Sequence, residues 1–278
     1  MHVLEWGPAD AARTIVLVHG NPTWGFLWRK VIAELVTRDA FRGVRLVVPD
    51  LIGLGMSSKP AHAAHTLIHH SQWLGDVLDQ IAPGPIVLAA QDWGGPISLH
   101  AMSSRMPRLR GIVLGNTAVS PPHANFKPTL FHRLSQLPVA SDLLFRRLGF
   151  PLGVLHLSQG DRSSIRGEVA AAYRWPLRTV ADRAAPLALA RMVPDSHDRH
   201  VSIPALRISQ YTFEMAEVPL HLVWGTKDPI LGRVINHLER LRPDATITRT
   251  EAGHFLQEEV PVPLADAITD VAKRAHWT

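Results

Sequence analysis

The feature that most constrains the fold of this 278-residue chain is a series of short apolar runs, each ending at a turn signal. Most of these runs are continuous rather than alternating in hydrophobicity, which is typical of strands buried on both faces of a parallel sheet. Segments of helical length separate several of them. This alternation predicts an α/β fold with a mostly parallel, doubly wound sheet. The expected strands are 14–18, 44–48, 85–89, 111–114, 220–224 and 246–248, and three of the expected helices are 73–81, 96–106 and 234–241.

The alternation of strands and helices breaks between about residues 120 and 204. This stretch is rich in Pro, Leu, Ala and Arg, and it contains no strong strand signal. We interpret residues 120–204 as an inserted helical cap over the carboxyl ends of the strands, with residues 1–119 and 205–278 forming the core. An ordinary run of peripheral helices is the alternative interpretation.

The composition excludes several classes of protein. Lys+Arg 29 minus Asp+Glu 24 leaves a net charge of only +5 with no basic run, so we expect no nucleic-acid partner. The absence of cysteine excludes disulfides, thiolate metal sites and a cysteine nucleophile. No apolar run approaches the length of a membrane span, and no signal-peptide pattern is visible at the N-terminus. We therefore expect a soluble, cytoplasmic protein without a membrane partner.

A candidate nucleophile follows the apolar run at 85–89. Residues 90–94 have the small–x–nucleophile–x–small pattern of a nucleophile elbow, with Asp92 in the central position. The chain has no Gly-x-Ser-x-Gly, which disfavours a serine esterase. An aspartate is ionised at neutral pH, so it can displace a leaving group from saturated carbon and form an alkyl ester. The alternative for Asp92 is a helix N-cap.

Two further residues follow later strands in the order that complements such a nucleophile. Asp228 follows the strand at 220–224, and His254 follows the last strand, so the order is nucleophile, acid, histidine. His254 would take a proton from water, and Asp228 would hold the imidazole tautomer. The backbone N–H groups of Trp93 and Asn21 are the expected oxyanion donors. A surface histidine and a turn aspartate are the alternatives for His254 and Asp228.

Five motifs follow one another along the chain: His19-Gly20-Asn21-Pro22-Thr23, Asp50-Leu51-Ile52-Gly53-Leu54-Gly55, Gln91-Asp92-Trp93-Gly94-Gly95, Asp228 and Gly253-His254. Taken in this order, they resemble the motifs of the haloalkane dehalogenases, and the resemblance covers nearly the whole chain and is weakest in the cap.

The resemblance implies an α/β-hydrolase fold, a small haloalkane as substrate, and neither metal nor organic cofactor. It also implies that Asp92 displaces the halide while the Asn21 amide and the Trp93 indole N–H bind it. His254 would activate the water that cleaves the ester. Some members carry the acid where this chain has Asn116, which leaves Asp228 as the candidate. This combination resembles the third subfamily, whose members tend to form large oligomers.

Two other functions stay open. An epoxide hydrolase shares the fold and the aspartate, but it usually protonates the epoxide with two cap tyrosines. This chain has only Tyr173 and Tyr211, and only Tyr173 falls in the cap. A non-catalytic ligand-binding protein on the same fold is the alternative from another class.

Two features depart from the family or from its chemistry. Family members usually begin with an additional edge strand, whereas Met1–Trp6 aligns with their second strand. We hypothesise that another subunit covers the exposed edge, and a misassigned start codon is the alternative. Separately, four histidines between residues 62 and 70 are irregularly spaced with no carboxylate nearby, which favours a solvated surface over a metal site.

Overall fold

A single mixed sheet organises the molecule. The computed structural model describes residues 1–128 and 130–277, and in these ranges the sheet has seven strands in the order β1-β3-β2-β4-β5-β6-β7. Only β1 runs antiparallel to its neighbour. The strands are β1 (Val3–Trp6), β2 (Thr14–Val18), β3 (Arg45–Pro49), β4 (Ile86–Gln91), β5 (Leu109–Gly115), β6 (Leu220–Gly225) and β7 (Thr246–Thr250).

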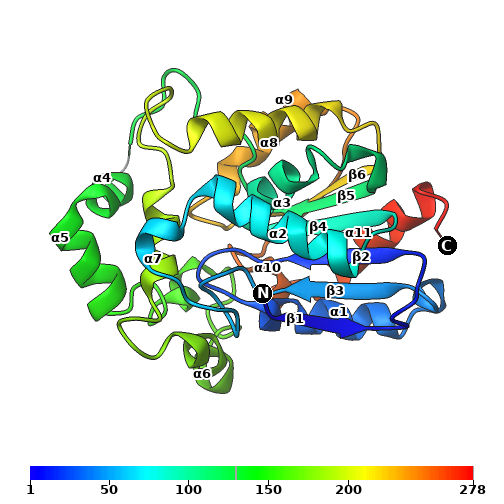
Figure 1. Ribbon diagram of the computed structural model, residues 1–278, viewed down its shortest axis with the longest axis horizontal. Helices are drawn as coiled ribbons and strands as arrows, with labels where there is room; N and C mark the ends of the chain where they lie inside the picture. The colour runs from blue at the N-terminus through cyan, green and yellow to red at the C-terminus, as the bar shows by residue number, and fades with distance from the viewer. Residues whose placement is uncertain (129, 278) are drawn as a thin grey trace.

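Helices cover both faces of this sheet (Figure 1). The α-helices of the described residues are α1 (Arg29–Val36), α2 (Leu67–Ile81), α3 (Gly94–Met102), α4 (Leu130–Gln136), α5 (Pro138–Ser141), α6 (Gly167–Arg174), α7 (Ala184–Arg191), α8 (Ile203–Met215), α9 (Ile235–Leu241), α10 (Leu256–Glu259) and α11 (Pro261–Arg274). Apolar side chains of α2, α3, α8 and α9 pack on one face, and those of α1 and α11 pack on the other. The predicted doubly wound α/β fold is confirmed.

The continuous apolar runs have a simple explanation in this packing. In β2, Val16 and Val18 contact the first of these helix layers, while Ile15 and Leu17 contact the second. Successive side chains of a strand point to opposite faces, so a strand covered on both faces needs an apolar residue at every position. All five residues of β2 are buried for this reason.

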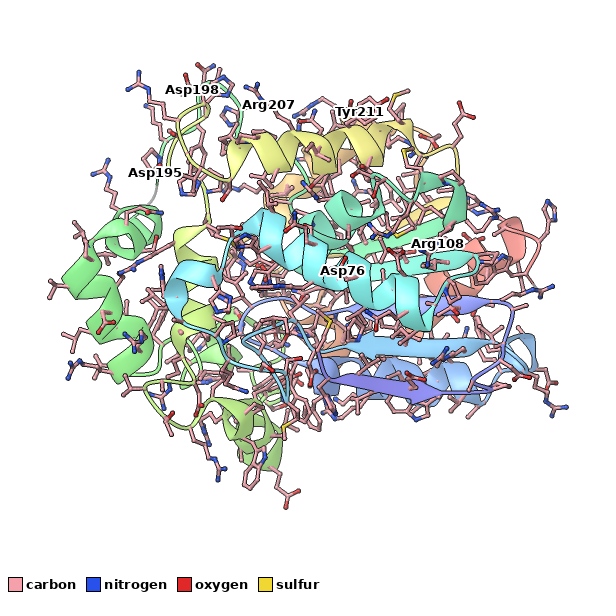
Figure 2. All side chains as sticks on the ribbon, in the orientation of Figure 1. Asp76, Arg108, Asp195, Asp198, Arg207 and Tyr211 are labelled. Atoms are coloured by element: carbon pink, nitrogen blue, oxygen red, sulfur yellow. The ribbon has the colours of Figure 1, made fainter. Side chains whose placement is uncertain are left out.

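The stretch from 120 to 204 contains α4 to α7 and, within its described residues, no strand. These helices lie beyond one end of the sheet (Figure 1). Helix α8 begins at Ile203, just inside the predicted cap, and packs on α3, where the Ser209 hydroxyl donates to the Pro96 carbonyl at 2.8 Å. Its outer side carries Arg207 and Tyr211 (Figure 2). The boundaries of the cap as a separate domain stay a prediction.

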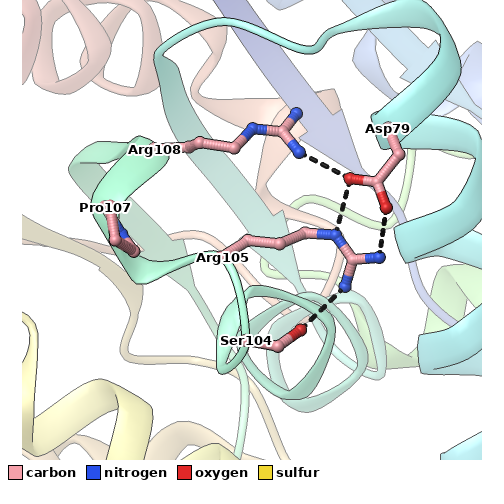
Figure 3. Close-up of a pocket in the computed structure, with 5 residues that line it drawn as sticks. All are labelled: Asp79, Ser104, Arg105, Pro107 and Arg108. Atoms are coloured by element: carbon pink, nitrogen blue, oxygen red, sulfur yellow. Dashed lines mark hydrogen bonds and ion pairs between the residues drawn. The ribbon is translucent and has the colours of Figure 1, made fainter.

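At the opposite end of the sheet, Asp79 near the end of α2 joins that helix to the chain entering β5. Its carboxylate accepts hydrogen bonds from Arg105 at 2.8 and 2.5 Å and from Arg108 at 2.6 Å (Figure 3). A surface hollow of about 450 Å³ lies over these side chains. The three charged groups therefore hold α2 against the amino ends of the strands.

The strand β1 is at the edge of the sheet. Its residues pair with β3 from Val3 opposite Pro49 to Trp6 opposite Leu46. Among the described residues no strand pairs with its outer side. The hypothesis that another subunit covers this edge stays a prediction. No helix in the described part of the chain combines the length and apolar character needed to span a bilayer.

Candidate active site

The sharp turn between β4 and α3 presents Asp92 at the carboxyl end of the central strands. Asp92 has a φ of +52°, a left-handed conformation that is unusual for a residue other than glycine. Its N–H donates to the Asn116 carbonyl at 3.1 Å, and its carbonyl accepts from the Thr117 hydroxyl at 2.6 Å. A Cβ on Gly94 would lie 2.5 Å from the Val18 carbonyl oxygen. The strained turn with small neighbours that residues 90–94 predicted is therefore present.

The Asp92 carboxylate lies between a backbone donor and the His254 ring. Oδ1 accepts a hydrogen bond from the Asn21 N–H at 2.7 Å, and Oδ2 lies 3.6 Å from His254 Nε2. The Asp92 side chain is 15% exposed to solvent, whereas the His254 side chain is 3% exposed. Asp92 is therefore the more accessible of the two to a small molecule.

The opposite side of the His254 ring contacts a buried acid. Nδ1 of His254 lies 2.9 Å from Asp228 Oδ2, and this oxygen also accepts from the Asn116 amide at 2.7 Å. The other oxygen of Asp228 accepts from the Ile230 N–H at 2.7 Å. The structure thus brings together the three residues that the chain order predicted, although they come from three different loops.

The charges at this site stabilise a protonated imidazole. Burial by itself lowers the pKa of His254, but the carboxylates of Asp228 and Asp92 outweigh this effect and raise it to about 10. Burial also disfavours the charged form of Asp228 and by itself raises its pKa. The contact with His254 outweighs this effect, so the pKa of Asp228 is lowered overall. His254 is therefore protonated at neutral pH as long as both carboxylates are ionised.

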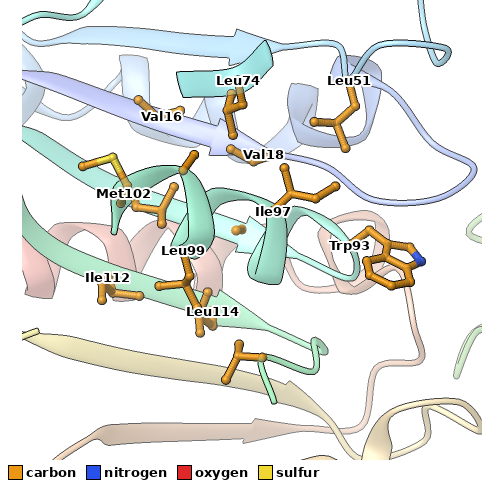
Figure 4. Close-up of a cluster of buried hydrophobic side chains, with 14 of the residues drawn as sticks. Val16, Val18, Leu51, Leu74, Trp93, Ile97, Leu99, Met102, Ile112 and Leu114 are labelled. Atoms are coloured by element: carbon orange, nitrogen blue, oxygen red, sulfur yellow. The ribbon is translucent and has the colours of Figure 1, made fainter. Parts of the chain in front are cut away.

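The two predicted halide ligands flank the elbow. Trp93 lies at the end of the apolar cluster between the sheet and α3, with its indole nitrogen directed away from the core (Figure 4). The Asn21 amide nitrogen donates to the Pro186 carbonyl of α7 at 3.2 Å. Its amide oxygen is buried without a partner among the described residues. One amide hydrogen of Asn21 is therefore engaged by the cap, which leaves the second as the potential halide donor.

Two carboxamides support the site in ways that the sequence did not reveal. Asn116 holds Asp228, and its oxygen accepts from the Gly225 N–H at 2.8 Å. Gln91 donates to the His254 carbonyl at 3.0 Å. Both residues directly follow or end a buried strand, but the sequence contains no signal for their partners, which lie more than 100 residues away.

The histidines near residue 65 form a buried pair. His65 and His70 are 5% and 0% exposed, and their ring nitrogens Nδ1 and Nε2 lie 3.0 Å apart. Burial lowers the pKa of His70 to about 3, so this ring is neutral. The expectation of a solvated surface is wrong for these two residues, because their rings stack on each other and pack against Trp73 of α2. Within the described residues no three candidate ligands gather to hold a metal ion.

Comparisons with known proteins agree with this geometry. Residues 13–261 match the family described as alpha/beta hydrolase fold. A haloalkane dehalogenase of Mycobacterium marinum is 32% identical over 96% of this chain and 87% of its own length. Haloalkane dehalogenase 2 of Mycobacterium tuberculosis is 30% identical over 92% and 86%.

The fold is also that of solved structures. The tetrameric haloalkane dehalogenase DpaA from Paraglaciecola agarilytica NO2 superposes with a TM-score of 0.79 at 24% identity, covering 95% of this chain and 85% of that one. From the match over most of its length and the identity to curated relatives, the chain belongs to the haloalkane dehalogenase family of α/β hydrolases.

Proposed function

We propose that this protein hydrolyses the carbon–halogen bond of small haloalkanes to an alcohol, a halide ion and a proton. The observation that carries the proposal is the contact of His254 with two carboxylates, one of them Asp92 on the elbow. An ionised aspartate in the nucleophile position suits attack on saturated carbon and needs no base for this step.

In the first step, a lone pair of Asp92 Oδ2 forms a bond to the halogen-bearing carbon, and the carbon–halogen electron pair departs with the halide. The Trp93 indole N–H and the free amide hydrogen of Asn21 would stabilise the departing anion. Hydrogen bonds to a charged partner contribute about 1.5–3 kcal/mol each. The product of this step is an alkyl ester of Asp92.

In the second step, water loses a proton to His254 Nε2 and attacks the ester carbonyl carbon. Formation of the ester removes the Asp92 charge, which is one of the two charges that raise the pKa of His254. The pKa of the imidazole therefore falls, and the ring releases to solvent the proton that it carries in the free protein before it acts as base. The Asn21 N–H, 2.7 Å from Oδ1 in the free protein, would stabilise the oxyanion. Collapse of this intermediate breaks the bond between the Asp92 carbonyl carbon and the alkyl oxygen, and His254 gives its proton to that oxygen. The alcohol leaves, and the resulting carboxylic acid ionises to restore the Asp92 carboxylate.

The structure also bears on the alternative of epoxide hydrolysis. The hydroxyl of Tyr173 is buried and donates to Glu258 Oε1 at 2.5 Å. Tyr211 is 59% exposed on the outer side of α8. Neither hydroxyl is arranged to donate a proton to an epoxide at Asp92, which favours the haloalkane.

The decisive experiment uses His254→Phe with a panel of bromoalkanes. We expect one bromide released per active site and a mass increase equal to the alkyl group, because displacement needs Asp92 but hydrolysis needs the imidazole. Asp92→Ala is the matched control and should release no bromide and gain no mass. Intact substrate together with unmodified His254→Phe protein, while the wild type is active, would refute these roles. A wild type that opens an epoxide and leaves bromoalkanes intact would identify an epoxide hydrolase, and inactivity toward both would favour a ligand-binding protein.

The remaining expectations concern assembly, subfamily and location. We propose that the protein self-associates and that a second subunit covers the outer side of β1. Gel filtration with light scattering tests this, and a sharp monomer at micromolar concentration would contradict it. Membership of the third subfamily and a cytoplasmic location stay predictions.

A further inference from the structure

A short segment of the cap contacts the loop that carries His254. The His254 N–H donates to the Ser158 carbonyl at 2.8 Å. The side chain of Gln159, which is 6% exposed, accepts from the Phe255 N–H at 2.9 Å and donates to the Phe255 carbonyl at 3.1 Å. Gln159 thus binds both polar backbone groups of the residue next to His254.

Glu259 joins the same two segments from the other side. Its Oε1 accepts from the N–H of Gly253 at 3.0 Å and from the N–H of Gly160 at 3.1 Å. Its Oε2 accepts from the Asp161 N–H at 2.7 Å. The N–H groups of residues 253, 254 and 255 are therefore all bound, either by the cap segment 158–159 or by a carboxylate that holds the cap segment 160–161.

The packing between the two segments leaves no space for displacement toward the cap. A Cβ on Gly253 would lie 2.2 Å from the Ser158 carbonyl oxygen and 2.4 Å from Gln159 Cα. The His254 ring packs edge-on against the Phe255 ring, with centroids 4.7 Å apart. A shift of the backbone at Phe255 would therefore move the imidazole.

We propose that Gln159 and Glu259 are positioning residues that hold the His254 loop so that the imidazole serves as base. This inference rests on the proposed function, and it assigns to the cap a part in the hydrolysis step. Asp228 contacts the ring at Nδ1 and Gln91 Nε2 lies 3.4 Å from Nε2, but the place of the whole ring still depends on the backbone that carries it. Asp92 is held separately by Asn21, Asn116 and Thr117. Loss of Gln159 should therefore slow hydrolysis of the ester and spare displacement of the halide.

The test is Gln159→Leu, which nearly preserves side-chain volume and removes both hydrogen bonds to Phe255. In rapid-mixing experiments with a bromoalkane, we expect the bromide burst to stay within about twofold of the wild type. Ester hydrolysis should slow by about tenfold or more, since small misplacements of a catalytic group cost up to about 10²-fold. Alkylated protein should then accumulate in the mass spectrum during turnover.

A second pair of variants tests the contact between Glu259 and the His254 loop. Glu259→Leu removes the acceptor for Gly253 and should show the same selective slowing. Glu259→Gln retains Oε1 as the acceptor for Gly253 and Gly160, loses only the acceptor for Asp161, and should restore most of the hydrolysis rate. The matched control is Gln136→Leu, because the Gln136 amide donates to the Arg191 carbonyl at 2.9 Å within the cap and away from the loop. This control should leave both steps unchanged.

Equal slowing of both steps in Gln159→Leu, or an unchanged hydrolysis rate, overturns the positioning role. Hydrogen exchange gives a readout that does not depend on halide chemistry. The amides of residues 253–255 should exchange faster in Gln159→Leu than in the wild type or in Gln136→Leu. If the wild type releases no halide, the proposed function is overturned. Faster exchange in Gln159→Leu would even then support the inference that Gln159 restrains the His254 loop. Unchanged exchange would overturn the inference that Gln159 restrains this loop, whether or not the wild type releases halide.

Discussion

At the scale of single residues, the site depends on how tightly the Asp228 carboxylate is held. Its two oxygens accept hydrogen bonds from Asn116 and Ile230 in addition to the contact with His254. The acid is buried, so these donors compensate for the water that it has lost. The resulting fixed negative charge keeps a proton on His254 in the folded state, and this has a consequence for stability.

We expect His254 to stabilise the fold in a defined pH range. Its pKa is about 10 in the folded protein and near 6.5 as a free side chain, so the folded state binds the proton more tightly. The stabilisation is complete below about pH 6.5 and is lost as the pH rises toward 10. The free energy of unfolding of the wild type minus that of His254→Phe, measured by urea titration, should therefore fall between pH 6.5 and 10. A pH-independent difference would contradict the raised pKa.

At the scale of secondary-structure elements, α2 is attached at both ends by different means. Its N-terminal Thr66 caps the helix by accepting from the His69 N–H. Near its C-terminal end, Asp79 pairs with Arg105 and Arg108, and the hydrogen bond from Arg105 lowers the pKa of Asp79 to about 2. The Asp79 side chain is half-exposed, so solvent weakens these ion pairs.

We expect Asp79→Asn to lower the free energy of unfolding by about 0.5–1 kcal/mol, because exposed ion pairs contribute little individually and two are weakened here. Bromide release should not change, since Asp79 lies at the amino ends of the strands. Asp76→Asn is the control: it is one turn earlier on the same helix and attracts Arg105 only at longer range, whereas the direct ion pairs of Arg105 and Arg108 are with Asp79. Urea unfolding at neutral pH is the measurement, and equal stability of the two variants would contradict the expectation.

At the scale of the whole molecule, one buried carboxylate joins the cap to the core. Glu258 of α10 is 3% exposed and binds Arg29 at 2.5 and 2.9 Å, while the Tyr173 hydroxyl of α6 donates to it at 2.5 Å. The Tyr173 ring also stacks on Phe255, with centroids 6.5 Å apart. This part of the cap is thus attached to the core beside the catalytic loop.

We expect Tyr173→Phe to lower the free energy of unfolding by about 1–3 kcal/mol, because it removes a buried hydrogen bond to a charged group. Protease cleavage within residues 120–204 should become faster, since α6 is held less tightly. Tyr211→Phe provides the control, because that hydroxyl is on an exposed side chain. Identical stability and proteolysis of the two variants would show that the Glu258 contact does not hold the cap.

The sequence by itself predicted six of the seven strands in the described residues and named the candidates for the reacting groups. Strands such as β2 are buried on both faces, so their signal is local and continuous, and 14–18 was predicted without error. The prediction 96–106 extended beyond α3, which ends at Met102, because the apolar spacing continues into the turn that follows. Asp92 directly follows β4, Asp228 and His254 come within four residues of the ends of β6 and β7, and the parallel topology brings the ends of those strands together.

Only the tertiary structure decided what holds these groups in place. Gln159 and Phe255 are 96 residues apart, and Asn116 and Asp228 are 112 apart. A carboxamide that binds a distant backbone has no periodic pattern and no fixed spacing, so nothing in the chain marks its partner. The cap segment that carries Gln159 lacks the continuous apolar runs that identified the strands. Its place against the His254 loop follows from close packing and hydrogen bonding, which exist only once the chain has folded.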